Sequence, residues 1–477
     1  MSNNLIIGWG EADITPNDSI LLNGQFYRRF ADTVDTPLKA IASVFGDGED
    51  RVIWVACDLL SVPYELTVEV AKRLSSKIPD ITENQIILSA THIHAGPFLL
   101  RTGNGTFSSL LSFRHDGEDI LLPEDIFSQV AGGIVNAILE ANSNKRPSYV
   151  ETSVLRILTG YNRRCVYSDG TAEMYGSRQR SDFVGLEGCD GGPCSVMYVY
   201  NKEDSQLSGI IASVPCTAQV LEHVRYITSD YWGYVRENIQ RELGENVTIL
   251  GLCSSAGDLS PRDLISTMAN EPDMNEKDGC KKLAQVLSQG FIQQRNDPLS
   301  RSEESFTHKV SVVDFPLWQP TKEEYEKAEK VIQEINQNYD LSPKCFDDGS
   351  KLDYDMCIRY SEAEIQRSRY SDRQQYKSCA IHALRIGNAV FLTNPFELFI
   401  AYGIRIRAAL PGVLLFDSQL TVDNFGYLPT KEGAAHKGYS GMIFNGITGP
   451  TGGDLLVEKS ISLVKDLYLF KPAASSK

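Results

Sequence analysis

The chain has 477 residues, of which 42% are hydrophobic and 23% are charged, a composition that suits a large buried core and excludes a disordered chain. Its 62 acidic and 46 basic side chains give a formal net charge of −16, and without a run of Lys and Arg to follow phosphates we expect no nucleic-acid partner. Since no apolar stretch approaches the ~20 residues of a membrane helix and the first residues lack a signal peptide, we expect a soluble protein, cytoplasmic as given, or secreted or periplasmic after removal of a signal.

Strands and helices alternate along the predicted chain. Runs rich in Val, Ile and Leu predict strands at 51–60, 85–91, 246–253, 311–317, 379–386, 389–392 and 413–420. Helical patterns occupy 63–77, 124–141, 230–243, 279–294, 321–338 and 396–409. The alternation predicts an α/β or α+β body. No Pro/Ser linker divides the chain, so we expect one domain over 1–477, with the polar segment 339–376 as an insertion or lid.

The ten cysteines are too sparse for a disulfide scaffold, and none forms a CxxC pair typical of structural zinc. Cys189 and Cys194 flank a Gly-rich loop. In an oxidising compartment these two thiols would be candidates for a bridge, although spacing alone does not fix the required geometry.

Two of the seven histidines lie two residues apart, in Thr91-His92-Ile93-His94, directly after an apolar strand. On an extended backbone, residues i and i+2 point to the same face, so both imidazoles would project from the carboxyl end of a buried strand. Ligands in α/β proteins bind at that end. The alternative is a pair of core or surface histidines, but the Gly-Pro stop that follows favours a site.

Small and polar residues follow another strand, in the segment 254–262. Asp258 offers a hydrogen-bond acceptor there and Ser260 offers a hydroxyl, while the small residues around them let the backbone approach a ligand. The alternative interpretation is a simple turn or helix cap.

A carboxylate and two tyrosines complete the candidate residues. Glu397 follows an apolar strand and is expected in the first turn of a helix, a position that the helix dipole favours for structural reasons alone. Tyr427 lies in Gly426-Tyr427-Leu428-Pro429-Thr430, and Tyr439 lies twelve residues further on. Each tyrosine taken alone is a packing residue by default.

Taken together, these segments resemble the neutral ceramidase family. Thr91 to Pro97 resembles the THTHSGP stretch of that family, 257–261 its GDVSP, 394–397 its PGE and 426–430 its GYVTT, in the same order. The segment 10–16 is similar to its opening ADITP, and 161–163 to its NRSP. The resemblance spans about residues 8–455 and implies mixed β-sheets flanked by helices, as in a neutral ceramidase catalytic domain.

The resemblance also implies a metal site, because neutral ceramidases hold zinc with two His, a Glu and a Tyr. It assigns His92, Glu397 and Tyr427 as ligands of one zinc ion per chain. His94, Arg163, Ser260 and Tyr439 are then expected to bind substrate or stabilise an oxyanion, and His94 or a neighbouring carboxylate such as Asp258 to move a proton. Zinc accepts N and O ligands and lowers the pKa of bound water to about 7.

The sequence departs from the family at the second His ligand. Where neutral ceramidases have an HPT segment, this chain reads Val214-Pro215-Cys216-Thr217. We consider three alternatives: the Cys216 thiolate replaces the histidine, Glu222 or His223 reaches the metal, or the site holds metal poorly or not at all. The chain also ends soon after Tyr427, so the C-terminal immunoglobulin-like domain of ceramidases is expected to be absent.

The sequence therefore predicts a zinc-dependent hydrolase of an amide or ester bond, with a small-molecule, glycan or lipid substrate other than ceramide. One alternative is a carbohydrate-active enzyme on the same fold, either a deacylase or a glycoside hydrolase. A second is a relative that binds a ligand without catalysis, which stoichiometric metal after purification would exclude.

Overall fold

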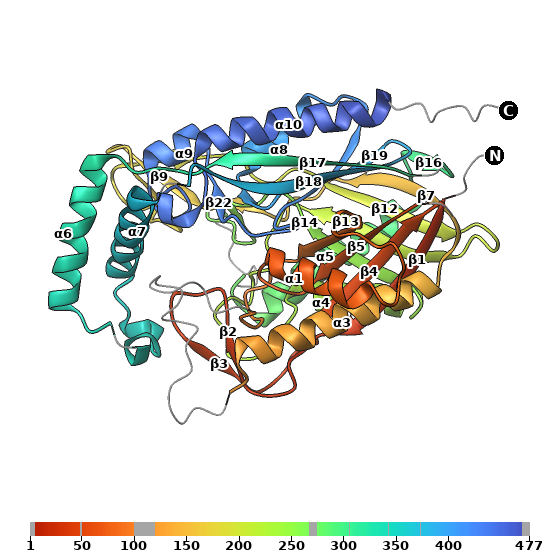
Figure 1. Cartoon of the computed structure of the whole chain (residues 1–477), viewed down its shortest axis with the longest axis horizontal. Coiled ribbons are helices and arrows are strands. Elements are labelled where there is room, and N and C mark those ends of the chain that lie inside the picture. The colour runs from red at the N-terminus through yellow and green to blue at the C-terminus, as the bar shows by residue number, and fades with distance from the viewer. Residues whose placement is uncertain are drawn as a thin grey trace.

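The structure, a computed structural model, describes residues 5–47, 50–99, 120–266, 274–304, 306–341, 343–372 and 374–469. Two β-sheets stack face to face at its centre, and helices cover their outer faces (Figure 1). One apolar cluster fills the space between the two sheets. A second lies between the larger sheet and its helices, and a third between the smaller sheet and its helices. The predicted α/β fold with mixed sheets flanked by helices is therefore confirmed.

The larger sheet is mixed. Its strand order is β14 (Thr248–Cys253), β13 (Leu207–Val214), β12 (Cys194–Asn201), β7 (Arg146–Leu155), β1 (Ile6–Asp13), β4 (Lys39–Gly46), β5 (Arg51–Cys57) and β6 (Ile86–Ala90), with β16 (Ser300–Ser302) beside β7. The outer pairs β13/β14 and β5/β6 are parallel, and the strands between them are antiparallel.

Both faces of this sheet are buried, which explains the continuous apolar runs in its strands. In β5, the odd-numbered residues 53, 55 and 57 belong to the cluster beneath the helices, whereas the even-numbered residues 52, 54 and 56 face the second sheet. The covering helices are α1 (Tyr64–Leu74), α3 (Pro123–Ser143), α4 (Tyr231–Leu243) and α5 (Lys277–Gln294).

The smaller sheet has the order β17 (Thr307–Pro316), β18 (Tyr376–Ile386), β19 (Ala389–Thr393) and β21 (Leu414–Ser418), with β19 and β21 parallel. Helices α8 (Ile400–Ala408) and α10 (Pro450–Leu469) cover its outer face. Phe391 stacks on Phe416 at a centroid distance of 4.4 Å and reaches Trp54 of the larger sheet at 5.7 Å. These aromatic contacts join the two sheets.

Helices α6 (Lys322–Asn338) and α7 (Tyr354–Ser371) stand side by side at one end of the molecule (Figure 1). The capping box predicted at the start of α6 is present, since Thr321 and Glu324 exchange hydrogen bonds. The expected insertion 339–376 contains two 3₁₀ turns, η2 (Pro343–Phe346) and η3 (Gly349–Lys351), followed by α7 and the first residue of β18. Much of this polar segment is thus helical.

Short elements connect these layers: β2 (Ile20–Leu22), β3 (Arg29–Ala31), η1 (Glu83–Gln85), β8 (Tyr161–Asn162), β9 (Arg164–Tyr167), β10 (Ala172–Met174), β11 (Phe183–Leu186), β15 (Leu259–Ser260), β20 (Glu397–Leu398), β22 (Tyr427–Leu428), α9 (Lys431–His436) and η4 (Ile443–Asn445). One predicted boundary is wrong, because Glu397 lies in β20 and the helix after it begins only at Ile400. The single-domain assignment stays a prediction.

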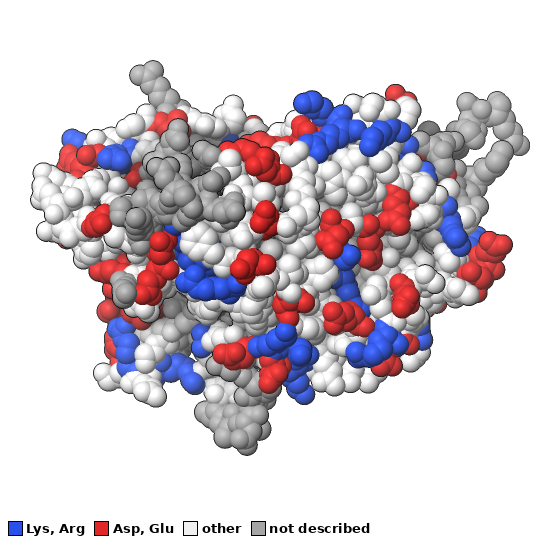
Figure 2. Space-filling view, turned by 90° about the horizontal axis from the view of Figure 1, so that it is seen from below, with Lys and Arg blue, Asp and Glu red and all other residues white. Residues whose placement is uncertain are grey.

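The ten cysteines are all free, so the candidate Cys189–Cys194 bridge is absent; Cys194 is buried at the start of β12, whereas Cys189 is exposed. In the described part of the chain, no helix is long and apolar enough to cross a membrane. Acidic and basic side chains are interspersed over the face shown in Figure 2.

Candidate active site

The candidate site lies where β6 of the larger sheet and β19 of the smaller sheet end. The backbone after β21 joins them, because the Ala90 N–H donates to the Leu420 carbonyl (3.2 Å) and the Val422 N–H donates to the Leu88 carbonyl (2.9 Å). Strand ends from both sheets therefore converge on one region. This is the geometry that places side chains distant in sequence around one ligand.

His92 and His94 lie beyond the end of β6, and their backbone is not extended as predicted. His92 has a φ of 64°, a conformation that is costly for a residue other than glycine and often occurs at functional sites. Hydrogen bonds from its N–H to the Leu59 carbonyl (3.0 Å) and between its Nδ1 and the Leu60 carbonyl (2.8 Å) hold it there. The prediction that both rings point to one face assumed an extended strand, but the strand ends at Ala90. The rings of His92 and His94 nevertheless meet edge to face.

The two imidazoles present their Nε2 atoms to each other. His94 Nδ1 lies 3.1 Å from the Gly24 carbonyl, so in both rings Nδ1 is assigned the proton and Nε2 is an acceptor. The two Nε2 atoms are 3.4 Å apart. Facing lone pairs at this distance favour a proton or a cation between them.

Glu397 and Tyr427 are direct neighbours in a parallel strand pair, in which β20 lies beside β22. The Glu397 N–H donates to the Gly426 carbonyl at 2.8 Å, and the carboxylate Oε2 lies 3.4 Å from His92 Nε2. Tyr427 also hydrogen-bonds this carboxylate through its side chain. The predicted ligands His92, Glu397 and Tyr427 therefore form one cluster.

Arg163 braces this cluster. It lies between β8 and β9 with only 3% of its surface exposed, and its Nη2 donates to the Tyr427 hydroxyl (3.0 Å) and to the Gly257 carbonyl (2.9 Å). Its Nε is buried and has no hydrogen-bond partner among the described residues. A buried donor without a partner is costly unless a ligand completes it.

Ser260 and Asp258 support the site from behind. Ser260 is fully buried on β15, and its Oγ accepts the Arg262 N–H at 3.0 Å and interacts with Tyr175. The Asp258 carboxylate accepts the Ile400 N–H (2.7 Å) and the Asn162 amide (3.1 Å), while burial raises its pKa to about 6. Neither side chain lines the adjacent cavity, so the structure favours a positioning role over the predicted catalytic one.

A cavity of about 500 Å³ opens on the other side of the cluster. Its wall includes His94, Arg163, Tyr427 and Tyr439 from the predicted set. The further lining side chains come from several loops and from α7: Gln25, Phe26, Glu173, Met174, Tyr175, Glu222, His223, Arg262, Tyr354, Asp355 and Ile358. The hydrophobic side chains are few beside the polar, charged and tyrosine side chains.

Three of these lining residues had little or no signal in the sequence as part of a site. Tyr175 is tied to the site by its neighbours, since its N–H donates to the Arg163 carbonyl at 2.8 Å and its ring lies under Arg262 at 5.1 Å. Arg262 directly follows the motif that contains Ser260, and this position was its only signal in the sequence as a site residue. Glu222, considered only as a replacement ligand, lies 3.8 Å from His94 Nδ1, not near His92 Nε2.

Cys216 does not join the cluster. It is fully buried in the apolar core between the larger sheet and its helices, and its Sγ contacts the Thr217 carbonyl at 3.5 Å. Burial raises the pKa of its thiol well above the usual value, which opposes the thiolate form that binds metal. The predicted alternative of Cys216 ligation is therefore not supported by the structure. His223 likewise faces Tyr27 (3.2 Å) and Glu222 (3.5 Å).

Burial and charge set the protonation of the acidic groups. Burial raises the pKa of Tyr439 to about 12 and raises the pKa of Tyr427 well above its usual value, with the Glu397 charge adding to both shifts. Burial also acts to raise the pKa of Glu397, but its neighbours His92, Tyr427 and Arg163 lower it overall. The cluster thus combines an ionised carboxylate with protonated phenols.

The cluster offers some of the donor atoms that zinc requires. Within the described residues, no group of three or more His, Cys, Asp or Glu side chains is arranged to hold a metal ion. His92 Nε2, Glu397 Oε2 and the Tyr427 hydroxyl nevertheless provide one nitrogen and two oxygen donors, with the His92 tautomer fixed by the Leu60 carbonyl. Such a backbone-oriented imidazole and hard oxygen donors fit zinc.

The fold matches solved structures of one class of hydrolase. Over 100% of this chain and 77% of the other, it superposes on the neutral ceramidase from Pseudomonas aeruginosa with a TM-score of 0.69 and 18% identity. A structure described as ceramidase complexed with C2 matches with a TM-score of 0.69 and 17% identity, over 99% of this chain and 77% of that chain. The chain therefore has the neutral ceramidase fold.

The sequence places the chain within a family. Residues 5–306 match the family described as neutral/alkaline non-lysosomal ceramidase, N-terminal. The chain belongs to this family, as the resemblance indicated. It is 24% identical to the neutral ceramidase of Pseudomonas aeruginosa over 245 residues, which are 49% of this chain and 32% of that protein. The match thus spans about a third of that relative's length.

Proposed function

We propose that this protein is a hydrolase of an amide or ester bond that uses one zinc ion held by His92, Glu397 and Tyr427. The observation that carries the proposal is their convergence, with His92 Nε2 3.4 Å from Glu397 Oε2, behind a cavity walled by His94, Arg163 and Tyr439. Zinc bound there would supply a water of lowered pKa and polarise the scissile carbonyl.

Side chains around the cavity would supply hydrogen bonds to the substrate oxygen and to the nucleophile. Arg163 lines the cavity, and its buried Nε has no hydrogen-bond partner within the described residues, so its guanidinium is suited to donate a hydrogen bond to the oxygen that becomes negative. Tyr439 stays protonated at neutral pH and offers a second donor. His94 keeps its Nε2 as an acceptor because its Nδ1 faces the Gly24 carbonyl, and this nitrogen can accept a hydrogen bond from the nucleophile.

The cavity favours a compact polar substrate over a lipid with two alkyl chains. Glu222 and Arg262 place opposite charges in its wall, and Tyr175, Tyr354 and Tyr439 add hydroxyl-bearing rings. Such a lining suits a sugar-like head group, which hydrogen-bonds charged groups and packs against aromatic faces. The second candidate function is therefore deacylation of a carbohydrate, in which the same chemistry acts on an N-acyl or O-acyl sugar.

Metal analysis and substitution test the proposal. We expect about one zinc per purified chain, and we expect His92→Ala and Glu397→Ala each to lose metal and hydrolysis with little change in circular dichroism. Cys216→Ser is the matched control, because Cys216 lies in the core away from the cluster, and it should keep its zinc. Full metal content in both alanine variants would show that these ligands are wrongly assigned.

A substrate panel then separates the two functions. N-acyl amino sugars, O-acyl sugars, simple N-acyl amines and a short-chain ceramide are offered to the zinc-loaded protein. Preference for the sugars would support carbohydrate deacylation, and preference for the simple amides would support the general amidase. No turnover by a zinc-loaded, folded protein would favour a role in ligand binding.

A further inference from the structure

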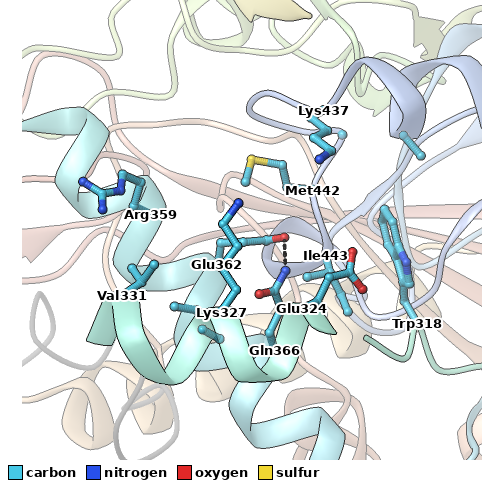
Figure 3. A pocket seen from close by; sticks show the side chains of 14 residues that line it. Trp318, Glu324, Lys327, Val331, Arg359, Glu362, Gln366, Lys437, Met442 and Ile443 are labelled. Carbon is cyan, nitrogen blue, oxygen red and sulfur yellow. Dashed lines mark hydrogen bonds between the residues drawn. The ribbon is translucent and has the colours of Figure 1, made fainter. Parts of the chain in front are cut away.

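A second hollow of about 340 Å³ lies beside α7 (Figure 3). Helices α6 and α7 form part of its wall, and the segment 434–443 faces them. In the view of Figure 3, Arg359 lies at one end and Trp318 at the other, with Lys437 and Met442 above Glu362. None of the residues predicted for the active site lines it.

Two lysines give this hollow its available charge. Lys327 comes from α6 and Lys437 from the opposite segment, and neither ammonium group forms an ion pair with a carboxylate in the described part of the chain. Arg359, by contrast, pairs with Glu334 at 3.1 Å. Two ammonium groups that enter one hollow without a direct ion pair are available to pair with an anionic ligand.

The two carboxylates in the wall are already engaged by the fold. Glu362 accepts the Phe444 N–H (3.0 Å) through Oε2 and the Gln366 amide (2.9 Å) through Oε1, the bond drawn in Figure 3. Glu324 accepts the Thr321 N–H at 2.8 Å in the capping box of α6. Both carboxylates thus have hydrogen-bond partners in the fold, and neither forms an ion pair with Lys327 or Lys437 within the described residues.

The rest of the wall is apolar and rigidly placed. Trp318 is fixed through its backbone, since its N–H donates to the Ile447 carbonyl (2.9 Å) and its own carbonyl accepts from Arg369 (3.3 Å). The other apolar lining residues are Ala328, Val331, Ala363, Ala434, Met442 and Ile443. An indole plane and small aliphatic groups suit a flat apolar body.

We propose that this hollow is a binding site for a small aromatic carboxylate, with its ring against Trp318 and its carboxylate between Lys327 and Lys437. The site is separate from the catalytic cavity, because α7 presents different residues to each: Tyr354, Asp355 and Ile358 to the cavity, and Arg359, Glu362 and Gln366 to the hollow. The proposal does not depend on the reaction that the protein catalyses.

Isothermal titration calorimetry of the full chain with phenylacetate tests this site, and phenylacetamide serves as the uncharged counterpart. We expect saturable binding of phenylacetate in the millimolar range, at least about tenfold tighter than that of the amide. Lys327→Gln and Trp318→Leu should each weaken binding by about tenfold. Lys330→Gln, an exposed lysine of the same helix outside the hollow, should leave it unchanged.

A variant of the catalytic cavity excludes binding at the wrong place. Arg262→Gln removes a cation from that cavity and should not alter phenylacetate binding. Loss of binding in Arg262→Gln with normal binding in Lys327→Gln would overturn the proposal, as would equal affinity for the amide or the absence of saturation. Thermal melting identifies a variant that fails to fold. If Trp318→Leu fails to fold, the binding measured with Lys327→Gln decides the question.

Discussion

The two hollows beside α7 differ in how their polar groups are satisfied. In the catalytic cavity, the buried Arg163 leaves its Nε without a hydrogen-bond partner within the described residues. In the second hollow, the lysines are exposed to solvent and the carboxylates are hydrogen-bonded. Unsatisfied buried groups are costly, whereas exposed cations are not. The first hollow is thus organised for chemistry, and the second for reversible binding.

The largest expected effect comes from the unsatisfied arginine. Arg163→Lys removes the planar donors that reach Tyr427, Gly257 and the cavity, and a lysine cannot replace them. We expect kcat/KM on the substrate found in the panel to fall by about a hundredfold or more, as for the loss of an oxyanion donor. The control is Arg178→Lys, an exposed arginine outside the cavity. A fall of less than threefold would show that Arg163 is only a structural brace.

A smaller effect is expected from the glycine that packs against the ligand strand. A Cβ added to Gly257 would lie 2.3 Å from the Glu397 carbonyl oxygen, so Gly257→Ala must displace the backbone of β20. We expect a loss of about 1–3 kcal/mol in the free energy of unfolding and reduced zinc content. Gly185→Ala, where nothing lies within 4 Å of the added Cβ, is the matched control. Chemical denaturation of both variants measures the difference, and equal stabilities would mean that β20 adapts freely.

The smallest effect concerns pH and the second hollow. Burial raises the pKa of Glu362 from 4.5 to about 7. Because the folded protein holds this proton more tightly than the unfolded chain, the contribution to stability is complete below about pH 4.5 and is lost as the pH rises through about 7. In Glu362→Gln, the decrease in the free energy of unfolding over that pH range should therefore be smaller by on the order of 1 kcal/mol.

The exposed Glu329→Gln on α6 is the control for that measurement and should follow the parent protein. Phenylacetate binding should weaken above pH 7 in the parent protein, since ionised Glu362 repels the carboxylate, and should stay level in Glu362→Gln. Parallel pH curves for the parent protein and Glu362→Gln would contradict both expectations.

Much of the fold was predictable because its apolar periodicity is strong. Each strand and helix expected up to residue 394 corresponds to an observed element with ends shifted by a few residues. Five strands of the larger sheet, β1, β4, β7, β12 and β13, were not predicted. Helix α7 was also missed because its exposed surface is polar, although its buried residues Met356, Cys357, Tyr360 and Ala363 have helical spacing. Glu397 was assigned to a helix because a helix follows closely, and its pairing with β22 is a long-range contact that no local pattern reveals.

The site was predictable in its members more than in its geometry. The motif order identified His92, Glu397, Tyr427 and Arg163, which the structure brings together. Cys216 was one of three alternatives for the missing histidine, and its side chain lies in the apolar core. The position of the Cys216 side chain depends on how strands and helices pack together, which the spacing of residues along the chain does not specify.

The pairing of β20 with β22 has a consequence for how the chain tolerates change. Glu397 stands opposite Tyr427 in a backbone ladder, so their separation is set by strand register and not by side-chain flexibility. Residues can be gained or lost in the loops between the two strands without separating this pair. Deleting one residue inside β20 or β22 would instead turn the carboxylate or the phenol, respectively, to the opposite face. Insertions and deletions in this part of the molecule are therefore expected in the connections and not within the short strands β20 and β22.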